Sequence, residues 1–183
     1  MELTKNLTQA KLIKSLVVVV LGSIALTISA KIKIPFYPVP MTMQTFVVIL
    51  LGIAFGSKIA LATVSLYLAE GIFGLPVFSN SPEKGVGIVY FTGPTMGYLI
   101  GFLFTSFFAG YLNFKTNLFM IFLKLIFSVS FIYFFGLIWL GVLIGWDKPI
   151  IELGALPFLY AELFKILLLT LLTKNILKIR NFI

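Results

Sequence analysis

Glu162 and Lys165 place an acid and a base three positions apart in the otherwise apolar segment 157–169. Side chains at positions i and i+3 lie on the same face of a helix. An ionised side chain at membrane depth is costly unless it faces a cavity or a partner. The pair therefore predicts a site that binds something polar. The alternative is an ion pair whose charges only compensate each other while holding two helices together.

The composition indicates an integral membrane protein. Of the 183 residues, 60% are hydrophobic and 11% are charged, whereas soluble domains carry about 25% charged residues. A chain of this length accommodates about six helical spans of ~20 residues with short loops. We therefore expect an all-α bundle of six transmembrane helices that forms one domain over residues 1–183, without room for a separate catalytic or nucleotide-binding domain.

The chain contains no cysteine and no histidine, which excludes thiol nucleophiles, imidazole relays and most transition-metal sites. It also has no P-loop pattern and no dinucleotide-binding glycine fingerprint. We therefore expect no catalytic residue, no metal and no cofactor, so that any active transport must draw its energy from a gradient or a partner. An intramembrane enzyme, such as an acyl or prenyl transferase, is the least favoured reading because it needs a carboxylate cluster or a nucleophile with its base.

Hydropathy predicts six membrane spans, of which the second and third are separated only by residues 56–58 and should form a tight helical hairpin. The first span has a basic start like that of a secretory signal, but we interpret it as uncleaved. The predicted spans are Leu12–Ile32, Met43–Phe55, Ala60–Phe73, Gly93–Leu112, Leu118–Leu140 and Ala155–Leu172.

The net charge of +8 comes from single basic residues at span ends, a pattern typical of membrane topology rather than of nucleic-acid binding. With six spans, both termini lie on one side, and the richer side in Lys and Arg is cytoplasmic. We therefore predict a multi-pass protein of the cell membrane with both termini in the cytoplasm. The residues assigned to that side are Lys5, Lys11, Lys14, Lys58, Lys115, Lys174, Lys178 and Arg180.

Two external segments interrupt the spans. Residues 33–40 contain Pro35, Pro38 and Pro40, which forbid a regular helix and predict an extended cover over a pocket. The second segment runs from Gly74 to Thr92, and its residues 86–91 are expected to re-enter or to pack on the helices. Irregular backbone at membrane depth is tolerated only against protein or a water-filled cavity.

Two blocks of the sequence resemble the signatures of a known family. Residues 38–46 read PVPMTMQTF and resemble the PVPxTxQTF motif of the BioY family, the biotin-binding S components of energy-coupling-factor (ECF) transporters. Residues 74–78 (GLPVF), followed by residues 93–102 (GPTMGYLIGF), resemble the family's second signature. The blocks occur in the family's order and near its spacing, so the resemblance covers roughly the whole chain.

The resemblance implies a membrane S component that captures biotin from outside. It also implies a transmembrane coupling subunit and two cytoplasmic ATPases that drive uptake, in agreement with the lack of an ATP motif in this chain. An S component for a different vitamin-like heterocycle is the alternative. The chain departs from the family where Glu162 replaces the usual Asp, where residues 79–84 replace a glycine-rich loop, and where Glu70 replaces an apolar residue. Whether Glu70 caps the external surface or pairs with Lys31, Lys33 or Lys84 stays open.

A biotin pocket needs an acceptor for the ureido N–H groups, a donor for the ureido carbonyl and apolar walls. The Glu162 carboxylate is the candidate acceptor. Lys165 either donates to the ureido oxygen, donates to the tail carboxylate, or only neutralises Glu162. The resemblance implies that an amide from the second external loop, Asn80, reaches the ureido ring, although Asn80 is also a common turn residue.

Two further candidates flank these residues. Gln44, directly after the proline segment, either contacts the ligand or ties down the loop backbone, and we favour the second reading. Tyr98 offers a hydroxyl or a ring wall, or else anchors its helix at the membrane interface.

The first span carries a surface of small residues that includes Gly22, Ala25 and Ser29. Small residues allow helices to approach closely, which suits contact with a partner membrane subunit or packing within the bundle. We include the three as candidate partner contacts.

Overall fold

The computed structural model describes the backbone of residues 2–180 and the side chains from residue 9 onward. The side chain of Lys5, which we assigned to the cytoplasmic side, lies outside this range. The described helices are α1 (Glu2–Lys31), α2 (Gln44–Phe55), α3 (Ser57–Ile72), α4 (Met96–Tyr111), α5 (Leu118–Ile144), α6 (Ile150–Gly154) and α7 (Leu159–Ile179). Two strands, β1 (Lys33–Ile34) and β2 (Met41–Thr42), and two 3₁₀ helices, η1 (Gly87–Thr92) and η2 (Leu156–Phe158), complete the described elements.

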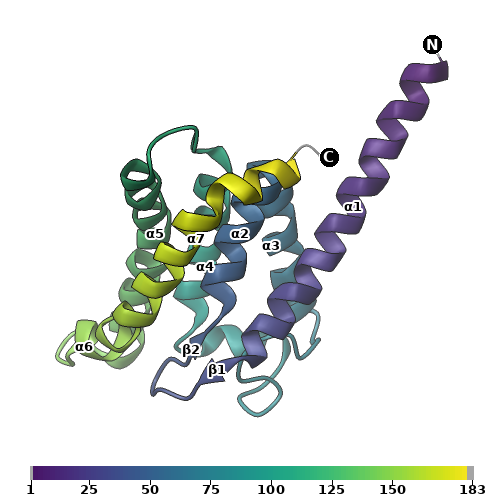
Figure 1. The fold of residues 1–183 in the computed structure, drawn as a ribbon. Coiled ribbons are helices and arrows are strands. Elements are labelled where there is room, and N and C mark those ends of the chain that lie inside the picture. Colours follow the sequence, from purple (N-terminus) through teal and green to yellow (C-terminus); the bar gives the residue numbers. More distant parts are fainter. Residues whose placement is uncertain (1, 181–183) are drawn as a thin grey trace.

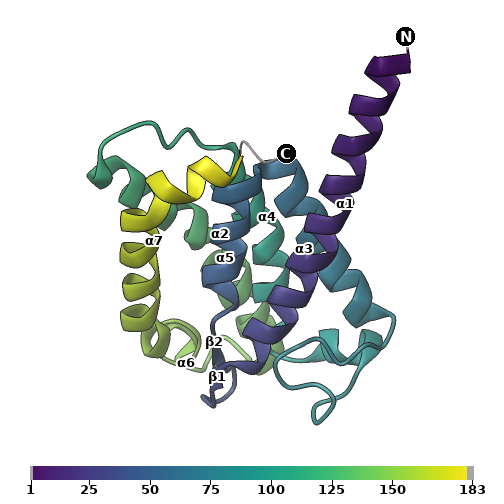
Figure 2. The same cartoon turned by 45° about the vertical axis from the view of Figure 1, so that its right-hand side comes forward.

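The helices form a bundle in which α2 contacts α3, α4 and α7 (Figure 1). α1 packs mainly against α3, and its N-terminal part projects away from the bundle. The view in Figure 2 shows that β1, β2 and the segment between α3 and α4 gather at the end of the bundle opposite the N-terminus. The structure therefore brings both predicted external segments to one end of the molecule.

Glycines allow the tightest helix contact, between α4 and α5. A Cβ atom on Gly101 would lie 2.5 Å from the Cα of Ile132, so that only a residue without a side chain fits there. The predicted hairpin between α2 and α3 turns at Gly56, whose φ of +80° favours glycine. These contacts explain how short helices hold a single bundle together.

The chain is an all-helical membrane protein, as its composition predicted. Within the part of the chain that the structure describes, three helical stretches are long and apolar enough to span a membrane: Gln9–Lys31, Leu118–Ile144 and Ile150–Ile179. The apolar helices α2 and α4 are shorter, so the count of six spans stays a prediction. The last helical region differs from expectation, because the 3₁₀ helix η2, which contains Pro157, stands between the short α6 and α7, and α7 begins at Leu159 rather than Ala155.

The proline segment forms the tip of a small hairpin. β1 and β2 pair antiparallel, with Lys33 opposite Thr42 and Ile34 opposite Met41. In the second external segment, residues 86–91 overlap η1 and pack on protein as expected: Tyr90 is buried, and its ring stacks on Phe78 with centroids 4.6 Å apart. Phe78 in turn meets the ring of Tyr67 on α3. These rings fix the second external segment over the end of the bundle.

Candidate binding pocket

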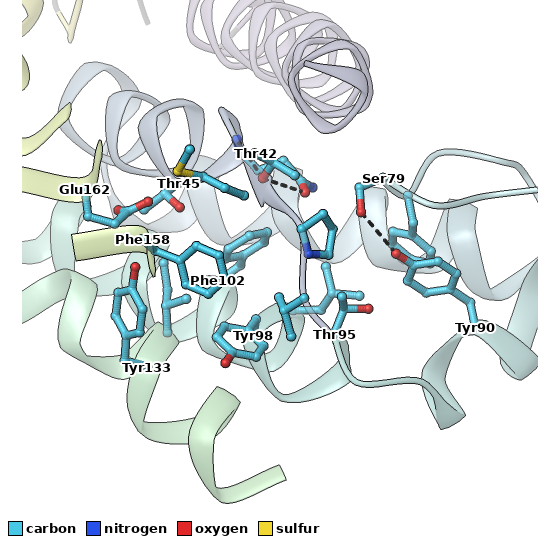
Figure 3. A pocket seen from close by; sticks show the side chains of 17 residues that line it. Thr42, Thr45, Ser79, Tyr90, Thr95, Tyr98, Phe102, Tyr133, Phe158 and Glu162 are labelled. Atoms are coloured by element: carbon cyan, nitrogen blue, oxygen red, sulfur yellow. Dashed lines mark hydrogen bonds between the residues drawn. The ribbon is translucent and has the colours of Figure 1, made fainter. Parts of the chain in front are cut away.

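A cavity of about 60 Å³ lies where β2, α2, α4, α5 and the start of α7 meet (Figure 3). Its walls combine aromatic and aliphatic side chains with polar groups that come from distant parts of the sequence. The polar residues that line it are Thr42, Gln44, Thr45, Ser79, Tyr90, Thr95, Tyr98, Tyr133 and Glu162.

Glu162 carries the most distinctive group of this cavity. Its Oε1 atom lies 2.6 Å from Nζ of Lys165, and both residues are only 5% exposed. The second carboxylate oxygen, Oε2, is buried and has no hydrogen-bond partner among the described residues. Because leaving a buried acceptor unpaired costs free energy, this oxygen marks a position at which a donor from a ligand would be stabilised.

Lys165 lies behind the carboxylate rather than in the cavity wall. Its Nζ donates to Oε1 of Glu162 and, at 2.7 Å, to the backbone carbonyl of Thr42. It lines a separate cavity of about 290 Å³ between β1, β2 and α7, whose other walls are almost entirely apolar. Although this second cavity is larger, the first is the better candidate for a polar ligand because the polar side chains converge there.

Gln44 borders the cavity but has protein partners of its own. Its Nε2 donates to the hydroxyl of Tyr67 at 2.7 Å, and its Oε1 accepts from the hydroxyl of Thr42 at 3.2 Å. The Tyr67 hydroxyl continues the chain by donating to the carbonyl of Val77. Gln44 thus connects β2 to α3 and to the second external segment, in line with the favoured reading that it ties down the loop.

Tyr98 lines the cavity with its ring. Its hydroxyl donates to the carbonyl of Gly154 at 2.8 Å and so is already committed to the α6 region. Phe102 and Phe158 add further aromatic surface to the same cavity. Because the hydroxyl is engaged, Tyr98 can contribute its ring to the cavity as an apolar wall.

Asn80 does not line this cavity, although its neighbours Phe78 and Ser79 do. Its side-chain oxygen accepts from Nζ of Lys33 at 3.0 Å, and the same Nζ donates to the carbonyl of Ser79 at 2.6 Å. It borders a recess of about 40 Å³ with Tyr90 and Thr95, which also line the main cavity. Asn80 therefore lies beside the pocket, held by a lysine of β1.

The start of the second external segment is clamped by Lys31 as well. Nζ of Lys31 donates to the carbonyls of Phe78 and Ser81 at 2.7 and 2.8 Å. Glu70 has a different partner from the lysines that we considered, because its Oε1 accepts from the hydroxyl of Ser23 on α1 at 2.9 Å.

The small-residue surface of α1 faces α3. A Cβ atom on Gly22 would lie 2.6 Å from Cγ2 of Thr63, so this glycine allows α1 and α3 to pack closely. Ser29 is also buried, whereas Ala25 is half-buried. Gly22 and Ser29 thus pack within the bundle, which was the alternative to contact with a partner. Contact of the three residues with a partner subunit stays a prediction.

Sequence reasoning missed several cavity residues. Tyr133 on α5, Thr45 on α2 and Phe158 in η2 all line the cavity, but they are far apart in the sequence. The only signal for Tyr133 was a polar aromatic residue within the longest apolar run, where a buried tyrosine usually requires a partner for its hydroxyl.

Comparison with known proteins gives the family directly. The model of the BioY family matches residues 3–182, nearly the entire sequence. The chain belongs to the BioY family. The BioY relatives include the probable biotin transporter of Pyrococcus horikoshii, 36% identical over 143 residues that cover 78% of this chain and 83% of the relative. The biotin transporter BioY of Thermotoga maritima is 34% identical over 155 residues, covering 84% of this chain and 90% of that protein.

A solved structure supports the BioY assignment at the level of the fold. The crystal structure of the S-component for biotin from an ECF-type ABC transporter superposes with a TM-score of 0.76 at 26% sequence identity. The match covers 92% of this chain and 93% of the solved one. The helical arrangement described above is therefore that of an S component, and membership of this transporter family, not of an enzyme family, is established.

Proposed function

We propose that this chain is the biotin-binding S component of an ECF-type transporter, which captures biotin from outside for uptake. The observation that carries the proposal is the buried, unpaired Oε2 atom of Glu162 at the wall of a cavity lined by aromatic rings. The relatives named as biotin transporters support the choice of ligand.

The chemistry of the cavity suits the ureido ring of biotin. An ureido N–H group donating to Oε2 of Glu162 would form a charge-assisted hydrogen bond and satisfy the unpaired oxygen. The rings of Tyr98, Phe102 and Phe158 offer apolar surface for the bicycle. Lys165 holds the carboxylate in place, and in this proposal it acts through Glu162 and Thr42.

The other predicted site residues act around this core. Gln44 keeps β2 in position through Tyr67, and the Asn80 amide contributes to ligand binding from the neighbouring recess. Binding of biotin by an S component needs no catalytic residue, metal or cofactor in this chain.

We further propose that residues 1–183 form one domain with six membrane spans and both termini in the cytoplasm. The lysine and arginine distribution supports this orientation. It places the hairpin of β1 and β2 and the cavity at the outer end of the bundle, so that the proline-rich tip covers a pocket open to the outside.

The proposed partners are a transmembrane coupling subunit and two cytoplasmic ABC-type ATPases, besides biotin and the lipid bilayer; nucleic acid is not among them. The solved relative comes from an ECF-type ABC transporter, which supports partners of this kind. Of the candidate contacts on α1, Ala25 is the one that remains partly accessible.

The test is equilibrium binding of biotin to the purified, biotin-depleted protein in detergent. Biotinamide, with a neutral tail, serves as the control for recognition of the carboxylate, and thiamine and riboflavin test the alternative of another heterocycle. We expect tight binding of biotin, and loss of high-affinity binding in the double variant Glu162→Gln, Lys165→Ala. Unchanged affinity in a folded double variant would refute the site, and binding of another vitamin in place of biotin would refute the ligand.

A further inference from the structure

The hydroxyl of Tyr133 is a polar group of the cavity that has no function in the site described so far. Tyr133 lies on α5, and its side chain lines the cavity. Figure 3 shows the hydroxyl pointing toward Glu162, with no hydrogen bond drawn to Tyr133 from the other lining residues. Its ring meets the ring of Tyr98 edge to face, with centroids 6.4 Å apart. The cavity therefore holds a hydroxyl donor that faces Glu162.

Two other candidate donors, Lys165 and Tyr98, are already engaged. Lys165 donates to Glu162 and to the carbonyl of Thr42 and does not line this cavity. The Tyr98 hydroxyl donates to Gly154. Thr45 also lines the cavity, and its hydroxyl is an alternative donor to the ligand. A phenolic O–H is a stronger hydrogen-bond donor than an aliphatic one because its proton is more acidic.

An acceptor beside a donor matches a ring in which an N–H group adjoins a carbonyl. In a cyclic urea both groups lie on one edge, so that a carboxylate and a hydroxyl can bind that edge together. We propose that the Tyr133 hydroxyl donates to the carbonyl oxygen of the ligand's ureido ring while Oε2 of Glu162 accepts the adjacent N–H. This inference rests on the proposed function and assigns the two ends of the ureido edge to two named residues.

The consequence is selectivity for oxygen at the ureido position. A thiocarbonyl is a much weaker acceptor than a carbonyl, so 2-thiobiotin would gain little from the Tyr133 hydroxyl. Replacing Tyr133 by Phe removes the donor and keeps the ring, and thus its contact with Tyr98. The ratio of the affinities for biotin and 2-thiobiotin therefore reports this one hydrogen bond.

The experiment measures binding of biotin, 2-thiobiotin and biotinamide to the full chain and to the variants Tyr133→Phe and Thr45→Val. We expect Tyr133→Phe to weaken biotin binding about 10-fold, as for a buried carbonyl that loses its donor, and to weaken 2-thiobiotin binding much less. The preference for biotin over biotinamide should be unchanged in that variant. Thr45→Val should leave the ratio of biotin to 2-thiobiotin as it is in the unmodified protein.

Three outcomes overturn the inference: equal weakening of biotin and 2-thiobiotin by Tyr133→Phe, no weakening of either, or a changed ratio only in Thr45→Val. Thermal unfolding of each variant shows whether it is folded, and the isosteric Phe makes a folded variant the expectation. If the unmodified, folded chain does not bind biotin, the proposed function itself fails. If the chain binds biotin but Tyr133→Phe leaves the ratio of the affinities for biotin and 2-thiobiotin unchanged, only the assignment of the Tyr133 hydroxyl fails.

Discussion

Phe36, in the loop between β1 and β2, meets Phe158 edge to face, with ring centroids 5.9 Å apart and an interplanar angle of 76°. Phe158 lines the candidate cavity. The contact therefore joins the proline-rich loop to the residues just before α7, two stretches far apart in the sequence. It places an aromatic ring of the loop beside the cavity wall.

Replacing Phe36 by Ala should speed the dissociation of biotin. Aromatic pairs contribute about 0.5–1.5 kcal/mol beyond their buried area, so we expect a 2- to 10-fold faster release, measured by chase with unlabelled biotin. The matched control is Tyr37→Ala, because Tyr37 is the next residue and is 84% exposed. Equal dissociation rates of biotin from both variants would show that the contact between Phe36 and Phe158 does not retain the ligand.

Lys165→Met should destabilise the protein even without ligand. The substitution leaves the carboxylate of Glu162 buried without a cation and frees the carbonyl of Thr42. Breaking one partner of a buried ion pair costs about 3–5 kcal/mol, which thermal unfolding in detergent would detect. Adding Glu162→Gln should restore part of the stability but not biotin binding. A single variant as stable as the unmodified protein would contradict the pairing.

Removing Lys31, at the end of α1, and Lys33, on β1, should loosen the second external segment. In the double variant Lys31→Met, Lys33→Met, the carbonyls of Phe78, Ser79 and Ser81 lose their lysine donors. We expect faster tryptic cleavage after the exposed Lys84, followed by mass spectrometry of the fragments. Lys148→Met is the control, because Lys148 pairs only with the neighbouring exposed Asp147. Cleavage after Lys84 at the unmodified rate would exclude a clamping effect of these lysines.

The chain has no cysteine, so single substitutions can test the proposed topology. Glu83→Cys and Lys148→Cys should react in intact cells with a reagent that cannot cross the membrane. Thr116→Cys should react only after the cells are opened. All three positions are exposed in the structure. The reverse pattern would place the termini outside the cell.

The sequence predicted the helices better than it predicted the pocket. Hydropathy located the helical segments because apolar runs and glycine turns are local features, and the spacing of Glu162 and Lys165 predicted their shared position on α7. The break before α7 was missed, since Pro157 falls within an apolar run that reads as one span.

The pocket depends on contacts between segments that no local pattern links. Tyr133 and Thr45 become neighbours of Glu162 only because α2, α5 and α7 converge. The resemblance implied that the Asn80 amide reaches the ligand, which stays a prediction; the sequence did not indicate that its amide oxygen accepts from Lys33, 47 positions earlier. Such pairings depend on the tertiary fold and could not be read from spacing.

Lys31 and Lys33 hold the second external segment mainly through main-chain oxygens, those of Phe78, Ser79 and Ser81. Every amino acid has a backbone carbonyl oxygen. The side chains at positions 79 and 81 can therefore be substituted without loss of these hydrogen bonds, and the backbone of the segment keeps its conformation. This tolerance is consistent with residues 79–84 standing where the resemblance led us to expect a glycine-rich loop. An inserted or deleted residue would shift the carbonyls away from the ammonium groups, so the length of this segment should vary less than its composition.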